Sequence, residues 1–181
     1  MCSSDLVFAM EAQYGVKGGV NFSNLDSGQA GVSEDFDLGF NVGGTATMPI
    51  DEKSSVSADL LYSLRNSKST VDATSTEIKS KLSFIDVPVR YNYSLSEEFT
   101  ISAGGYFSYL ISADAEVGGL EEDVKEFMED LDYGLTLGGA YSMDEWTFSA
   151  AYNLGLADLS TDESSEVKSS SIQVAASYKF N

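Results

Sequence analysis

The segment "YGVKGGVNFS" (residues 14–23) alternates between apolar and polar side chains. Successive side chains of a strand point to opposite faces, so one face of this segment collects the large apolar side chains, Tyr14, Val16, Val20 and Phe22. The opposite face is small or polar and carries Lys17. A soluble barrel buries such an apolar face, whereas a membrane barrel turns it toward lipid. The rest of the sequence decides between these two orientations.

The same alternation recurs in seven further segments, residues 36–48, 55–65, 84–93, 99–111, 133–141, 146–156 and 170–180. Together with residues 14–23 they predict an all-β chain of eight strands of about ten residues each, whereas strands average about five or six residues in soluble proteins. About ten tilted residues is the length that a strand needs to cross a bilayer. Apolar residues also occur on the polar face, namely Leu61, Leu82, Phe84, Tyr106 and Leu110. We expect a β-bulge near Leu82 and Phe84.

The connections between these segments alternate in length. Long, mostly acidic connections occur at residues 24–35, 66–76, 113–131 and 157–168, and short ones at 49–53, 94–98 and 142–145. This order predicts an antiparallel up-and-down transmembrane β-barrel with long outside loops, short periplasmic turns and both termini on the periplasmic side.

Charge and composition exclude several classes of protein. The 181 residues include 29 acidic and 10 basic side chains, a net charge of -19, which opposes binding to nucleic acid. No apolar run reaches the length of about 18 residues of a membrane helix. With no histidine and a single cysteine, Cys2, the sequence offers no Ser-His-Asp site, and an acid pair such as Asp59 and Asp86 lacks a nucleophile. We therefore expect no catalytic residue, no cofactor and no metal site.

The charged residues on the polar faces are expected to point into the barrel. An eight-stranded barrel is just wide enough for its side chains to fill the interior, and unpaired buried charge is costly. The sequence therefore predicts a side-chain-filled lumen with a network of paired charges, Lys17, Asp37, Asp59, Arg90, Asp132 and Lys179.

The aromatic residues of the apolar faces gather near the strand ends. At the expected periplasmic end they predict an interfacial girdle of Tyr14, Tyr93, Phe99, Tyr141, Trp146, Tyr178 and Phe180. A second band near the other end contains Phe22, Phe36, Tyr62, Tyr109, Tyr133 and Tyr152. So many large rings exceed what a small barrel interior holds, and this favours the apolar face pointing outward.

Two acidic segments, residues 121–130 and 158–166, are candidate cation sites, because clustered carboxylates suit calcium. Neither has the spacing of a calcium-binding loop, so a solvated acidic surface is the simpler interpretation. Helical spacing of Val124, Phe127, Met128 and Leu131 indicates a short amphipathic helix, which either binds a partner or lipid or covers the barrel mouth.

Residues 1–13 are interpreted as the remnant of a signal peptide or as a miscalled gene start, and residues 14–181 as one barrel domain. Several segments resemble the PorT-like outer-membrane β-barrel family of Gram-negative bacteria. They are "YGVKGGVNFSNL", "FIDVPVRYNY", "AGGYFSYLISA", "LDYGLTLGGAY", "YNLGLADLS" and "SIQVAASYKF". The resemblance implies a small eight-stranded barrel, and some relatives serve secretion machinery. The chain end also resembles the aromatic signal read by the barrel-insertion machinery, with Phe180 as the aromatic residue.

These observations predict a non-enzymatic, monomeric barrel of the bacterial outer membrane, with a structural or binding role exerted through its acidic outside loops. Its expected partners are membrane lipid, the insertion machinery, and an extracellular or periplasmic protein. A soluble lipocalin-like ligand carrier, a secretion-machinery accessory barrel and a lipid-modifying barrel enzyme remain alternatives.

Overall fold

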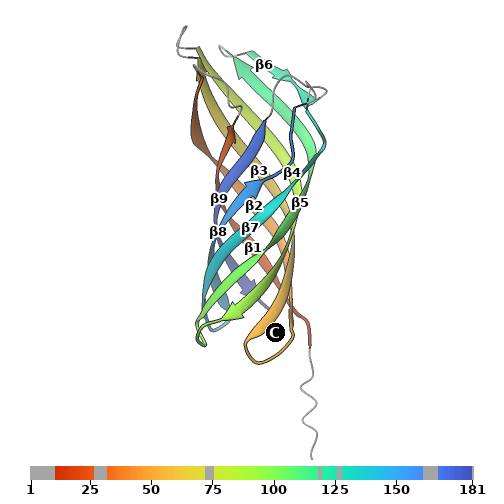
Figure 1. The fold of residues 1–181 in the computed structure, drawn as a ribbon, viewed down its shortest axis with the longest axis vertical. Helices are drawn as coiled ribbons and strands as arrows, with labels where there is room; N and C mark the ends of the chain where they lie inside the picture. The colour runs from red at the N-terminus through yellow and green to blue at the C-terminus, as the bar shows by residue number, and fades with distance from the viewer. Residues whose placement is uncertain are drawn as a thin grey trace, which may run out of the picture.

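A computed structural model describes residues 11–26, 32–71, 76–117, 120–125, 128–160 and 167–180. The strands are β1 (Gln13–Asp26), β2 (Val32–Pro49), β3 (Ser54–Val71), β4 (Thr76–Ser94), β5 (Phe99–Val117), β6 (Leu120–Asp123), β7 (Leu131–Met143), β8 (Trp146–Gly155) and β9 (Lys168–Lys179). All pairings between these strands are antiparallel, and β1 closes the sheet against β9 (Figure 1). Eight strands form the barrel wall, while the short β6 only extends the far end of β5. The predicted eight-stranded barrel is confirmed.

The register around the barrel fixes its tilt. A path of directly paired residues starts at Tyr14 in β1, crosses every wall strand, and returns to β1 at Asn24. This ten-residue stagger over eight strands, with about 3.3 Å rise and about 4.8 Å spacing, corresponds to a tilt of about 40°. Membrane barrels have tilts in this range.

Several strands are much longer than the sequence predicted. β2 and β3 have 18 residues each, and β4 and β5 have 19 each. At a tilt of about 40°, ten residues rise roughly 25 Å, which is the height of the apolar band of such barrels. The apolar alternation covers about this height, whereas the hydrogen-bonded ladder continues beyond it. Much of each segment that the sequence predicted as a long loop is therefore strand. The predicted loops were too long.

The outer surface is apolar and the interior is polar. Exposed large apolar side chains occur on every wall strand, for example Val16 and Leu137, which are 50% and 61% exposed. Lys17, Asp59 and Arg90 are buried inside. The soluble-carrier alternative required the reverse arrangement, so the structure does not favour it. No helix in the described part of the chain is long and apolar enough to span a bilayer.

Three of the apolar residues that interrupted the polar faces pack inside the barrel near the long-connection end. Leu82, Phe84, Leu110 and Ala113 make one buried cluster. The β4–β5 register shifts between Ser83 and Phe84, which confirms a bulge at this place. The additional residue lies on β5 opposite this step, so Leu110 and Ala113 both point inward.

Close strand packing depends on inward glycines. A Cβ atom added at Gly43 would lie 2.0 Å from the backbone oxygen of Leu60 on the next strand. At the neighbouring, outward-facing Gly44, the nearest atom would be 3.8 Å away, an ordinary contact. The narrow barrel therefore needs glycine at position 43 and tolerates a side chain at position 44.

Candidate functional site

The lumen holds two separate clusters of charged side chains. In the first, Lys17 Nζ donates to Asp59 Oδ2 at 2.8 Å, and an Arg90 guanidinium nitrogen donates to the same oxygen. Thr45 Oγ1 donates to Asp59 Oδ1 at 2.7 Å. All three charged side chains are less than 10% exposed. Two cations therefore share one carboxylate, which leaves this first cluster with one formal positive charge in excess.

The second cluster is centred on Arg65. Its guanidinium donates to Asp132 Oδ2 and to Asp86 Oδ1, both at 2.7 Å. It also donates to Ser108 Oγ at 2.9 Å and stacks over the ring of Phe84, 4.5 Å from its centroid. Here one cation serves two carboxylates, so the second cluster has one formal negative charge in excess.

The two clusters balance each other along the barrel axis. Three cations and three carboxylates make the lumen network formally neutral, with the positive excess nearer the short-turn end. A small cavity of about 10 Å³, lined by Arg65, Asp86 and Arg90 among others, is found between them. This volume is at the lower limit for a single water molecule, about 10–15 Å³.

The six predicted lumen residues are placed in three ways. Lys17, Asp59 and Arg90 meet in the first cluster, and Asp132 lies in the second. Asp37 instead pairs with Lys68, with 3.9 Å between Asp37 Oδ1 and Lys68 Nζ, and both side chains are partly exposed. Lys179 lines the cavity at the short-turn end and makes no ion pair with a described residue.

Sequence reasoning left Arg65 and Asp86 out of the network. Both lie on the polar face of their strands, so the alternation of polar and apolar residues already indicated that they point into the lumen. Arg65 is the last residue of the predicted segment 55–65, whereas β3 continues to Val71. Asp86 was considered only as an acid partner of Asp59, and the structure assigns the two carboxylates to different cations.

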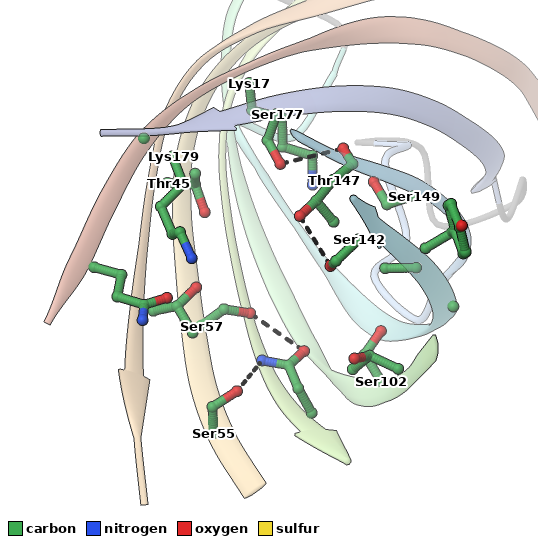
Figure 2. Close-up of a pocket in the computed structure, with 18 of the residues that line it drawn as sticks. Lys17, Thr45, Ser55, Ser57, Ser102, Ser142, Thr147, Ser149, Ser177 and Lys179 are labelled. Carbon is green, nitrogen blue, oxygen red and sulfur yellow. Dashed lines mark hydrogen bonds between the residues drawn. The ribbon is translucent and has the colours of Figure 1, made fainter. Parts of the chain in front are cut away.

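A polar cavity of about 710 Å³ opens at the short-turn end, and we name it the vestibule (Figure 2). Lys17 and Arg90 of the first cluster line it, and Glu97, Glu98 and Asp144 line it from the turns. Serine and threonine side chains supply much of the wall, including Ser57, Ser102 and Ser177. The predicted filled lumen is thus filled at the two charge clusters and above them, while its lower end is open.

The opposite end is covered by two connections. Val124 and Met128 pack against the cluster of Leu82, Phe84, Leu110 and Ala113. The Glu129 amide donates to the Leu159 carbonyl at 3.1 Å, which joins the two connections. The segment begins as strand β6, and Met128 N donates to the Lys125 carbonyl in a single turn, so the predicted helix is not seen among the described residues; Phe127 lies outside them.

Asp158 organises the second of these connections. Its Oδ1 accepts hydrogen bonds from the amides of Val167 at 2.9 Å and Ser160 at 3.0 Å. These backbone donors, Val167 first, lower the pKa of the Asp158 carboxyl below its ordinary value. The segment 158–166 predicted as a cation site is described only in part, and no metal-binding group of acidic or cysteine side chains occurs among the described residues.

The predicted aromatic girdle residues all lie on the outer surface. Their exposure ranges from 37% at Tyr178 to 59% at Phe180. Ring contacts join neighbours on adjacent strands: Phe99 and Tyr141 at 5.0 Å, and Trp146 and Tyr178 at 5.2 Å between centroids. Phe180 N donates to the Tyr14 carbonyl at 2.9 Å, which fastens the chain end to β1.

Comparison with known proteins gives a consistent result. The sequence profile of a family described as "Outer membrane protein beta-barrel domain" matches residues 8–161. Comparison with curated protein sequences found no match.

Among solved structures, the attachment invasion locus protein Ail of Yersinia pestis is 15% identical with a TM-score of 0.54, and the match covers 94% of this chain and 100% of that one. Neisserial surface protein A is 16% identical with a TM-score of 0.59, over 94% and 99% of the two chains. The outer membrane protein OprG of Pseudomonas aeruginosa is 15% identical with a TM-score of 0.50, over 95% and 97%. At these identities the likeness concerns the fold.

Proposed function

Because this chain belongs to the outer membrane protein beta-barrel domain family, we propose that it is a non-enzymatic barrel of the bacterial outer membrane that is closed to solute passage. Its role on this proposal is structural or one of binding, exerted at the outside loops. The observation that carries the proposal is the pair of charge clusters across the lumen. Lys17, Asp59 and Arg90 block one level and Arg65, Asp86 and Asp132 block the next.

The absence of a reaction is supported by the chemistry of the buried groups. Each lumen carboxylate is bonded to a cation, so none is placed as a free general base. The sequence contains no histidine that would activate a serine.

Conductance tests the closed lumen. Purified protein in planar bilayers is expected to give no steady ion current, because side chains fill the interior of an eight-stranded barrel. Stable, reproducible current steps from the folded protein would contradict the proposal. Folding is checked in the same sample by the difference in gel migration between unheated and heated protein.

Orientation and partners form the second part of the proposal. We place the short turns in the periplasm and the acidic connections outside, as in other barrels of this type. An epitope inserted at residues 72–75 should then bind antibody on intact cells, and one inserted at Asp51–Lys53 should not. We also propose that the chain acts as a monomer. Chemical cross-linking in membranes should then give only a band with the mass of one chain.

The resemblance of residues 14–25 and 84–93 to PorT-like barrels supports placing the chain in that group. An accessory role in secretion rests on that resemblance. Phe180 is proposed as the aromatic residue read by the insertion machinery, and its exposed position at the end of β9 supports this role. Deleting the gene and measuring secreted protein tests the accessory role, and unchanged secretion would contradict it.

A further inference from the structure

The vestibule ends at a positively charged floor. Lys17 and Arg90 line this cavity, and each makes one hydrogen bond with a described residue, in both cases to Asp59 Oδ2. An ammonium group has three donors and a guanidinium group has five. Most of their donors are therefore left for other acceptors, although the Lys17 and Arg90 side chains are only 5% and 9% exposed.

The carboxylates that balance the excess charge of this floor, Asp86 and Asp132, lie behind it in the second cluster and do not line the vestibule. The acidic residues that line the vestibule, Glu97, Glu98 and Asp144, are exposed in the turns at its mouth. Arg90 lies four residues inside β4 from Ser94, which is about 13 Å along the strand. Solvent and salt screen charges over about 8 Å at physiological ionic strength, so the mouth carboxylates compensate the floor weakly.

The vestibule wall suits an oxygen-rich anion. Hydroxyl groups of Ser57, Ser102 and Ser177 line it, and Figure 2 shows Lys17 and Lys179 on the same side of the cavity. Lys179 adds a third cation that makes no ion pair with a described residue. Hydrogen bonds from charged donors to oxyanions are the strong ones.

We propose that the vestibule is a binding site for a small oxyanion, of the phosphate or sulfate class, held by Lys17 and Arg90 at its floor. Lys179 attracts the anion at the entrance, and Asp59 keeps the two floor cations in place. The site does not depend on the proposed closure of the lumen or on a role of the outside loops. The conductance measurement tests the closed lumen and the anion-binding measurement tests this site, so the two proposals can fail independently.

Titration of the folded protein in detergent micelles with inorganic phosphate, at constant ionic strength, tests the proposal by calorimetry. Wild-type protein should show saturable binding of one phosphate. Arg90→Gln should weaken it about tenfold or more, because the remaining Lys17–Asp59 pair is neutral and a charged donor is lost.

Lys53→Gln is the matched control, since it removes one charge at the same end of the barrel from an exposed turn residue outside the vestibule lining. It should leave phosphate binding unchanged. If Arg90→Gln does not fold, Lys179→Gln serves in its place and should weaken binding several-fold. No saturable binding by wild-type protein at tens of millimolar phosphate, or equal weakening by Lys53→Gln, would overturn the proposal.

Discussion

Replacing Arg65 with methionine should destabilise the barrel severely. The guanidinium of Arg65 is the one described cation bonded to Asp86 and Asp132, at 2.7 Å each, and these three side chains are at most 9% exposed. A buried hydrogen bond to a charged group contributes about 1.5–3 kcal/mol, so the two together contribute about 3–6 kcal/mol. Removing one member of a buried ion pair costs about 3–5 kcal/mol, which agrees with that range.

The expected loss is a large part of the stability of an ordinary domain, about 5–15 kcal/mol. Urea unfolding in lipid vesicles, followed by the gel shift between unheated and heated protein, measures it. The triple variant R65M/D86N/D132N should recover most of the loss, because no buried charge then remains without a partner in the second cluster. A loss below about 1 kcal/mol for R65M, or a triple variant as unstable as R65M, would refute the reasoning.

Three further predictions follow from local geometry. Gly43→Ala should lower the free energy of unfolding by about 1–3 kcal/mol through overpacking, while Gly44→Ala in the same urea assay should leave it nearly unchanged; equal effects would contradict this. Phe180→Ala should reduce the amount of barrel assembled in cells yet leave refolding in detergent intact, and normal assembly would oppose the signal role. The pKa of the Asp158 carboxyl is lowered because its ionised form accepts a hydrogen bond from the Val167 amide. This bond stabilises the folded connection at any pH above the ordinary carboxyl pKa. The stabilisation is lost as the pH falls through the lowered pKa. Amide hydrogen exchange at Val167 should accelerate over that acidic window relative to neighbouring amides, and in Asp158→Ala at all pH values; protection independent of pH in the wild type would contradict it.

The sequence was sufficient for the barrel because lipid and lumen impose opposite demands on alternate residues. Tyr14, Val16 and Lys17 already show the arrangement that the whole wall repeats. The lengths of the strands could not be predicted in the same way. Beyond the lipid boundary both faces of β3 are polar, so the alternation vanishes while the ladder continues to Val71.

The sequence predicted that the lumen holds paired charges, but it predicted only some of the residues that pair. Parity placed Lys17, Asp59 and Arg90 inside, but partners across the barrel depend on the ten-residue stagger, which no local pattern shows. Apolar residues such as Phe84 and Leu110 were noted as exceptions, yet they pack inside at 0% exposure. They fill the part of the lumen beyond the charged pairs, toward the long-connection end.

The position of Trp146 tests the central claim most directly. It is the single tryptophan of the chain, is 46% exposed on the outer face, and stacks edge-on with Tyr178 near the short-turn end. In vesicles containing brominated lipids, its fluorescence should be quenched most by bromines near the headgroups and little by aqueous acrylamide. Strong acrylamide quenching without any quenching by brominated lipid would contradict a barrel whose apolar face meets the membrane.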